Sequence, residues 1–389
     1  MSGDTSETAR ASASPCVITI DLGALARNWR AIAALVAPAE CAAVVKADAY
    51  GVGVAGAVPA LSSAGCHTFF VATFEEAARV RALAPEAVIY VLDGPSAGGA
   101  AQFRSLGVRP VLSSLGDVRD WAAVSHDRGP RLGAALQVES GMNRLGLDRS
   151  EVDALVGEPS LLSRFETTLV MSHLASAELP GAAQNASQHR AFLTAASRFS
   201  EVPRSLAASG GILLGPSYHF DLVRPGYVLY GGQPSEGRAA PVEPVVRVEA
   251  RVLQVRDVEG GEAVGYGGAW VAPGRSRIAT IACGYADGLA RASGAPSAIK
   301  GGAIAFRGIR APIVGRVSMD LVTADVTELG AAAPRRGDLV ELIGPTISLE
   351  DAGRASGTIG YEVLTRLSRR ATRIYLDPAS EGGNRHGQG

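Results

Sequence analysis

The segment Ala42-Ala-Val-Val-Lys-Ala-Asp-Ala-Tyr-Gly-Val-Gly53 joins a short apolar run to a glycine-containing loop, with Lys46 at the junction. Lys46 is one of two lysines among 37 lysine and arginine residues, the other being Lys300. Arginine can serve as a surface cation, but only lysine becomes an amine nucleophile near neutral pH when it is desolvated. Lys46 at a strand end therefore suggests Schiff-base chemistry. The alternative is a structural lysine whose stem packs on apolar surface.

Around this segment, from about Asp21 to about Gly232, short apolar runs alternate with amphipathic stretches. Such alternation is typical of βα units on a parallel sheet. Seven or eight units in roughly 210 residues favour a (β/α)8 barrel, and no GxGxxG motif supports a doubly wound sheet. The predicted strands are Ala42–Val45, Thr68–Val71, Val88–Leu92, Arg109–Leu112, Gly133–Val138, Glu166–Met171 and Arg204–Ala207. The predicted helices are Leu22–Ala37, Phe74–Leu83, Asp117–His126 and Asn185–Phe199.

After Pro241 the pattern changes to β-branched runs separated by glycine and proline turns, which indicates a mostly antiparallel β-domain. Its predicted strands are Val245–Val258, Arg277–Ala282, Ile304–Phe306, Ala311–Val314, Leu321–Asp325 and Asp338–Ile343. An early strand at Cys16–Ile20 can pair with either domain. We therefore expect a disordered arm (residues 1–15), a barrel domain (16–240), a β-domain (241–380) and a disordered tail (381–389).

Composition excludes several classes of protein. The net charge of -1 and the pI near 6.6 give no support for a nucleic-acid or anionic-membrane partner. The four cysteines form no CxxC pair and no histidine stands at metal-ligand spacing, so they are interpreted as reduced thiols of a cytoplasmic protein without a metal. No apolar run approaches the ~20 residues of a transmembrane helix, and the first fifteen residues lack the apolar core of a signal peptide.

Unusual polar residues follow one predicted strand after another. In a barrel, the carboxyl ends of the strands form the active site. Each such residue alone has an ordinary structural explanation, but their recurrence at successive strand ends predicts a common site. These residues are Lys46, then Gln137, Glu139, Met142 and Arg144, then His173, then Ser209-Gly-Gly211, and finally Arg224-Pro-Gly-Tyr227.

The segment Ala43–Gly53 resembles the pyridoxal-phosphate attachment signature of the alanine racemase family. Three further segments resemble motifs of that family, in the family's order and across nearly all of the chain: Gly141-Met-Asn-Arg-Leu-Gly146, Cys283-Gly-Tyr-Ala-Asp-Gly-Leu289 and Gly315-Arg-Val-Ser-Met-Asp320. The resemblance implies a pyridoxal-phosphate barrel with a β-domain, in a head-to-tail homodimer whose active sites each borrow residues from the partner's β-domain. It also implies interconversion of L-alanine and D-alanine, with D-alanine supplied to peptidoglycan.

The resemblance assigns the two acid/base roles to Lys46 and Tyr285. Racemisation needs one such group on each face of the planar carbanion. Lys46, which also holds the cofactor, would act on D-alanine, and Tyr285 of the other subunit on L-alanine. A phenol of pKa about 10 needs help to act as a base, and His173 and Arg224 would supply it through a relay. Arg224 would also face the pyridine nitrogen, where a permanent cation disfavours protonation and weakens the ring as an electron sink.

The remaining matched residues are assigned to binding. The cofactor's phosphate would be held by hydroxyl and backbone N–H groups, and Arg144 with the backbone of Met319 would bind the substrate carboxylate. Gln137, Tyr266 and Asp320 would support the site, with Tyr266 narrowing the entrance in favour of alanine and then serine. The phosphate residues are Tyr50, Ser209, Gly226, Tyr227 and Tyr361.

Three positions depart from the family pattern. Gln137 stands where many members carry a carbamylated lysine, Ala208 where an asparagine is common, and Ser318 where a cysteine is frequent. Because the glutamine carbonyl is neutral, we expect no carbamate beside Arg144, and a chloride ion is an alternative occupant.

Other functions remain open. One is a racemase of broader specificity, including serine, or a decarboxylase of related fold. Decarboxylases of this fold usually place an acid at the pyridine nitrogen, so Arg224 argues against that chemistry. Another is a non-catalytic pyridoxal-phosphate-binding protein, and such proteins lack the β-domain that carries Tyr285.

Overall fold

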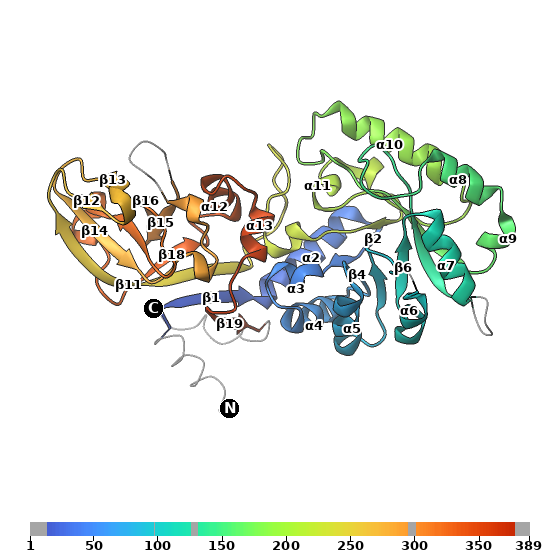
Figure 1. The fold of residues 1–389 in the computed structure, drawn as a ribbon, viewed down its shortest axis with the longest axis horizontal. Coiled ribbons are helices and arrows are strands. Elements are labelled where there is room, and N and C mark those ends of the chain that lie inside the picture. Colours follow the sequence, from blue (N-terminus) through green and yellow to red (C-terminus); the bar gives the residue numbers. More distant parts are fainter. Residues whose placement is uncertain (1–13, 97, 126–130, 295–300, 378–389) are drawn as a thin grey trace, which may run out of the picture. The chain divides into compact units, whose positions relative to one another are not determined.

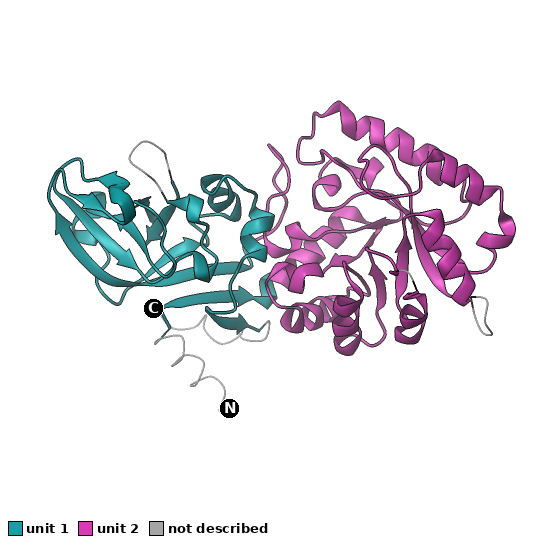
Figure 2. Ribbon diagram, in the orientation of Figure 1, with its two compact units in different colours: residues 1–24, 244–389 teal, residues 25–243 magenta. Residues whose placement is uncertain are grey.

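The computed structural model describes residues 14–96, 98–125, 131–294 and 301–377. Most of the predicted arm, residue 126 at the end of a predicted helix, and the predicted tail lie outside this range. Ser14 and Pro15, the last residues of the predicted arm, instead accept hydrogen bonds from Arg251. The chain divides into two compact units, Leu25–Glu243 and Met1–Ala24 with Pro244–Gly389 (Figure 2).

The first unit is built on parallel strands with helices packed around them (Figure 1). Its seven-stranded sheet runs in chain order: β3 (Ala43–Val44), β4 (Thr68–Val71), β5 (Val88–Val91), β6 (Arg109–Leu112), β7 (Gly133–Gln137), β8 (Glu166–Met171) and β9 (Arg204–Ser205). The helices are α2 (Leu22–Val36), α3 (Lys46–Tyr50), α4 (Val54–Ala64), α5 (Phe74–Leu83), α6 (Ala100–Leu106), α7 (Leu115–Ser125), α8 (Arg149–Val156), α9 (Pro159–Leu162), α10 (Ala183–Ala196) and α11 (Ser209–Ile212).

A short strand closes this sheet into a ring. β10 (Leu222–Val223) pairs in parallel with β2 (Glu40–Cys41). On its other side the N–H of Arg224 donates to the carbonyl of Ala207 just after β9 (2.9 Å), while the N–H of Ala42 donates to Val223 (3.0 Å). The predicted (β/α)8 barrel is confirmed. Its strands are almost entirely buried, as is typical of parallel strands with helices outside and packed side chains inside.

The second unit is a mostly antiparallel β-domain, also as predicted. Its eight strands follow the order β14-β17-β16-β15-β18-β11-β1-β19, and a further pairing joins β14 to β11. The strands are β1 (Cys16–Asp21), β11 (Val246–Val258), β14 (Ser276–Ile281), β15 (Ala303–Phe306), β16 (Ile309–Val314), β17 (Val322–Asp325), β18 (Leu339–Ile343) and β19 (Thr372–Leu376). A small hairpin, β12 (Ala263–Val264) with β13 (Trp270–Val271), and two helices, α12 (Leu349–Ala355) and α13 (Gly360–Thr365), complete it.

The first strand belongs to this β-domain, which corrects the predicted barrel domain of residues 16–240. β1 pairs antiparallel with β11, with Cys16 opposite Ala250, and parallel with β19, with Val17 opposite Thr372. The ring of barrel strands is already closed and offers no free edge for another strand. The long β11 of the β-domain has an edge that β1 can pair with. The units therefore divide at residues 24/25 and 243/244.

Candidate active site

Lys46 lies where the backbone leaves β3 and enters a left-handed turn. The four residues after it, Ala47 to Tyr50, all have φ of 54–55°. Residues with a Cβ disfavour this conformation by roughly 1–2 kcal/mol each, so surrounding bonds must hold it. The N–H of Ala47 donates to the carboxylate of Glu76 (2.7 Å), and the N–H of Val54 donates to Asp48 (2.9 Å). These bonds fix the point at which the lysine side chain leaves the strand.

Basic side chains gather around Lys46. Burial lowers the pKa of Lys46 below its ordinary value, and the nearby Arg144 cation lowers it further. Burial is also the main reason why the pKa of His173 falls to about 3, with Arg224, Arg144 and Lys46 as further causes. The structure thus brings together four residues that were predicted from separate strand ends. Because these basic groups disfavour one another's protonation, the site lowers the proton affinity of the lysine amine and favours an anionic ligand.

Arg224 is a cation fixed inside the barrel. Its side chain is buried, and burial lowers its pKa to about 10, so it stays protonated at neutral pH. The guanidinium donates to the carbonyl of Ser172 (2.6 Å) and to the hydroxyl of Ser205. Its carbon atom Cζ lies 5.9 Å from the centroid of the Phe70 ring. Ser172 directly precedes His173, so the two bonds tie Arg224 to the ends of β8 and β9.

The residues predicted to bind phosphate in the barrel converge on Gly226. The hydroxyl oxygen of Ser209 accepts the N–H groups of Gly226 (3.0 Å) and Val228 (3.3 Å). A Cβ on Gly226 would lie 2.4 Å from the hydroxyl of Tyr50, so only glycine allows this approach. Tyr227 is buried beside them. Tyr361 lies in the other unit, on α13, and is half-buried.

The loop after β7 carries Arg144 and is held by hydrogen bonds within the loop. The carboxylate of Glu139 accepts the N–H groups of Gly141 and Met142. Burial alone would raise the pKa of Glu139, but the backbone N–H groups of residues 141–144 outweigh burial and lower it. Glu139 therefore shapes the loop. The amide of Gln137, also buried, donates to the carbonyl of Leu145 (3.0 Å).

In the β-domain, Tyr285 and Met319 lie on adjoining loops. Tyr285 begins a short 3-10 turn, Tyr285–Asp287, and its N–H donates to the carbonyl of Ser318 (3.0 Å). The N–H of Ala286 donates to Met319 (3.0 Å). A Cβ on Gly284 would lie 2.3 Å from the carbonyl oxygen of Met319, so this glycine allows the two loops to touch. The side chains of Tyr285 and Met319 are exposed by 43% and 54%.

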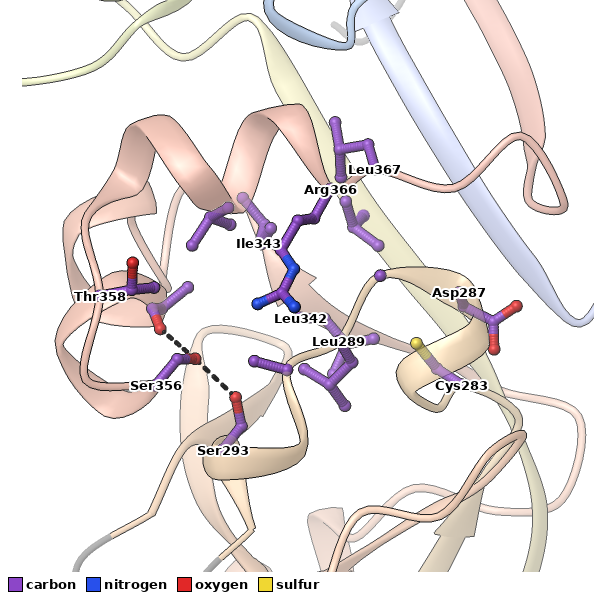
Figure 3. Close-up of a pocket in the computed structure, with 15 residues that line it drawn as sticks. Cys283, Asp287, Leu289, Ser293, Leu342, Ile343, Ser356, Thr358, Arg366 and Leu367 are labelled. Carbon is purple, nitrogen blue, oxygen red and sulfur yellow. Dashed lines mark hydrogen bonds between the residues drawn. The ribbon is translucent and has the colours of Figure 1, made fainter.

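The described part of the β-domain contains a cleft and a smaller cavity. A cleft of about 430 Å³ is lined by Tyr266, which is 71% exposed, together with Arg316, Ser318 and Leu321 among others. A smaller apolar cavity of about 50 Å³ lies behind the Tyr285–Asp287 turn, and none of the predicted site residues lines it (Figure 3). Of the two, only the cleft contains a predicted residue.

Sequence reasoning missed the polar partners that hold these residues. Ser172 and Ser205 bind Arg224. The buried Gln188 of α10 donates to the carbonyl of His173 (3.0 Å) and accepts from Ala175 (2.8 Å). A serine directly before a candidate histidine is a weak local signal, and nothing near Gln188 in the sequence indicates its partner. Among the residues that the structure describes, no cluster of three potential metal ligands occurs.

Comparison with known proteins identifies the family. The model of the alanine racemase N-terminal domain matches residues 20–234, and the model of the alanine racemase C-terminal domain matches residues 245–375. The chain belongs to the alanine racemase family. A relative named alanine racemase from Methylobacterium nodulans is 50% identical over 364 residues, covering 93% of this chain and 96% of the relative. Another from Brucella canis is 46% identical over 374 residues, covering 92% and 93%.

Solved structures of the alanine racemase family share the whole architecture. The crystal structure of alanine racemase from Bartonella henselae with covalently bound pyridoxal phosphate has a TM-score of 0.88 and 40% identity, covering 93% of this chain and all of that one. The biosynthetic alanine racemase from Pseudomonas aeruginosa has a TM-score of 0.87 and 34% identity, covering 94% of this chain and all of that one. No helix in the described part of the chain is long and apolar enough to span a membrane.

Proposed function

We propose that the chain is a pyridoxal-phosphate-dependent alanine racemase that interconverts L-alanine and D-alanine. The observation that carries the proposal is the cluster of Lys46, His173 and Arg224 at the strand ends of the barrel, in a chain 50% identical to a protein of that name. The D-alanine would serve peptidoglycan synthesis in the cytoplasm, and the four buried free cysteines suit a reducing compartment.

The barrel residues fit the cofactor group by group. Lys46 offers an amine of lowered pKa for the aldehyde. The hydroxyl of Ser209 accepts two backbone N–H groups, which leaves its own O–H to donate to a phosphate oxygen. Arg224 offers a buried cation for the pyridine nitrogen. Bound pyridoxal phosphate would withdraw electrons from Cα and make the Cα proton removable.

The protein side of the mechanism is proton transfer on two faces. Lys46, which is held at the start of the left-handed turn, would remove and return the Cα proton of D-alanine. Tyr285 of the partner subunit would do the same for L-alanine, with His173 and Arg224 completing the relay. Arg144 and the backbone of Met319 would bind and orient the substrate carboxylate. Tyr50, Gly226, Tyr227 and Tyr361 would hold the phosphate, with Gln137, Tyr266 and Asp320 in support.

We further propose a homodimer with shared active sites. Large apolar and aromatic side chains of the β-domain, Tyr266, Tyr285, Met319 and Leu321, are exposed by 71%, 43%, 54% and 38%. Exposed apolar groups gathered on a few loops are typical of a surface that another protein covers. A second copy of the chain is the proposed partner, because the family resemblance assigns these same loops to the neighbouring active site.

Racemisation can be tested by proton NMR of the purified protein with pyridoxal phosphate and L-alanine in D2O, with chiral analysis of the product. We expect the Cα proton signal to disappear while the L and D forms approach equal amounts. Tyr285→Phe should keep the cofactor absorbance and lose racemisation, while the control Tyr218→Phe in the barrel unit should keep both. Serine run in parallel measures specificity. Release of CO2 would contradict the proposed racemisation, and racemisation by Tyr285→Phe would contradict the two-base mechanism.

Shared active sites can be tested by mixing two inactive variants, Lys46→Ala and Tyr285→Phe. In a mixed dimer one site receives both defects and the other receives neither. Random exchange of subunits should therefore restore about a quarter of the wild-type sites. If each chain formed its own complete site, the mixture would remain inactive.

A further inference from the structure

The side chain of Arg370 binds two aspartates on two different loops. Its Nε lies 2.9 Å from Oδ1 of Asp287, and its Nη1 lies 2.7 Å from Oδ1 of Asp320. Asp287 ends the turn that begins at Tyr285, and Asp320 follows Met319 directly. A single guanidinium therefore bridges the loop of the proposed tyrosine base and the loop of the proposed carboxylate ligand.

Asp287 depends on this contact more than Asp320 does. The side chain of Asp287 is buried, whereas that of Asp320 is 56% exposed. In Figure 3 the carboxylate of Asp287 points away from the other residues of the apolar cavity, which Cys283 and Leu289 line. One carboxylate oxygen of Asp287 accepts the N–H of Gly284 (2.8 Å), which closes the turn around Tyr285. A buried carboxylate is stable only when it is paired and hydrogen-bonded, so Arg370 maintains the turn.

The geometry of the bridge suits arginine. The planar guanidinium offers donors at fixed directions and can contact two carboxylates at once, whereas the ammonium of lysine is a single point charge. The two loops are otherwise joined by backbone bonds, from Tyr285 to Ser318 and from Ala286 to Met319. These bonds fix the backbone at one side of the turn, and the bridge fixes its other side at Asp287.

We propose that Arg370 is a positioning residue for racemisation. It holds the turn that carries Tyr285 at a fixed place relative to Met319, so that the phenol and the substrate carboxylate keep their alignment. This inference rests on the proposed function, in which Tyr285 transfers the proton on the L face. Arg370 itself transfers no proton and touches no substrate.

The test compares exchange with inversion, starting from D-alanine in D2O. Lys46 alone suffices to replace the Cα proton of D-alanine by deuterium, but formation of L-alanine also needs Tyr285. In Arg370→Gln we expect the early ratio of deuterated D-alanine to L-alanine to rise by ~10–100-fold, the size typical of a displaced catalytic group. Arg370→Lys should give a smaller rise. Arg354→Gln, which removes an exposed arginine paired with Asp351 in the same domain, should leave the ratio unchanged.

The outcomes separate a positioning role from a structural one. A raised ratio in an enzyme that stays folded at the assay temperature and keeps its cofactor absorbance supports the inference, even if the melting temperature falls because buried Asp287 has lost its partner. An Arg370→Gln enzyme that folds, binds cofactor and shows the wild-type ratio overturns it, even if both rates fall together. If Arg370→Gln does not fold, Asp320→Asn decides, since Asp320 is exposed and its loss should raise the ratio as well. A wild-type protein that makes no L-alanine contradicts the proposed function itself.

Discussion

Nη2 of Arg224 lies 2.6 Å from the carbonyl oxygen of Ser172, the residue directly before His173. The backbone N–H of Arg224 also donates to Ala207 beyond β9, so this one residue links the ends of β8, β9 and β10. The bonds explain how a buried cation can be held in place. They also place the charge of Arg224 close enough to His173 to oppose protonation of the imidazole.

The first prediction concerns the shape of this cation. Arg224→Lys keeps a positive charge but loses the planar pair of Nη donors that binds Ser172 and Ser205. A lost hydrogen bond of a buried charged group costs roughly 1.5–3 kcal/mol, so we expect kcat to fall by about 10–100-fold. Steady-state racemisation rates measure this loss, with the exposed Arg190→Lys on α10 as control. A kcat equal to that of the control would show that the two Nη donors of Arg224 are unimportant for the rate of racemisation.

The second prediction follows from the pKa of His173, which is lowered to about 3. The unfolded histidine takes up a proton near pH 6.5 while the folded one stays neutral, so stability is present above pH 6.5 and is lost as the pH falls toward 3. Between pH 7.5 and pH 5 this one group should lower the free energy of unfolding of the apoprotein by about 2 kcal/mol.

Chemical denaturation at the two pH values measures that change. His173→Gln should reduce the difference in unfolding free energy by the same amount, and His67→Gln, at an exposed position, should not. If His173→Gln and the wild type show the same change in unfolding free energy between pH 7.5 and pH 5, then His173 takes up its proton in the folded protein at pH 5.

Local sequence patterns were sufficient to predict much of the fold. The bounds of β4, β6 and β8 agree with their predictions because each strand ends in a short apolar run. The strand that closes the barrel, Leu222–Val223, was not predicted, since two residues carry no periodicity. The placement of β1 was open because its partners, β11 and β19, lie more than two hundred residues away in the chain. Helices α12 and α13 were missed inside a region dominated by β-branched runs.

The candidate site was likewise only partly predictable from the sequence. Lys46, Arg144, His173 and Arg224 were identified from motifs and strand ends, and the structure brings them together. Their supporting partners could not be found, because a hydrogen bond such as that between Ser172 and Arg224 depends on how the barrel closes. Arg370 is another residue that the sequence does not identify, because it lies 83 residues from Asp287 in the chain and has no motif of its own.

The third prediction concerns cofactor affinity. Ser209→Ala removes both the acceptor for two N–H groups and the proposed donor to the phosphate. Loss of one charge-assisted hydrogen bond corresponds to roughly 1.5–3 kcal/mol, so the Kd for pyridoxal phosphate should rise by about 10–100-fold. Titration of the apoprotein followed by absorbance measures it. The exposed Ser217→Ala should bind as the wild type does, and equal affinity in both variants would remove Ser209 from the phosphate site.

The fourth prediction tests the departure at Gln137. Its amide N–H donates to Leu145 and its side chain carries no amine, so no carbamate can form there and bicarbonate should leave the rate of racemisation unchanged. In Gln137→Lys the new amine would be buried beside the loop that carries Arg144, and burial next to a cation should favour the neutral amine, which can react with CO2. Loss of the bond to Leu145 should lower kcat by about tenfold in CO2-free buffer. Bicarbonate should then raise the rate of the variant alone, and a wild-type enzyme stimulated by bicarbonate would contradict the prediction.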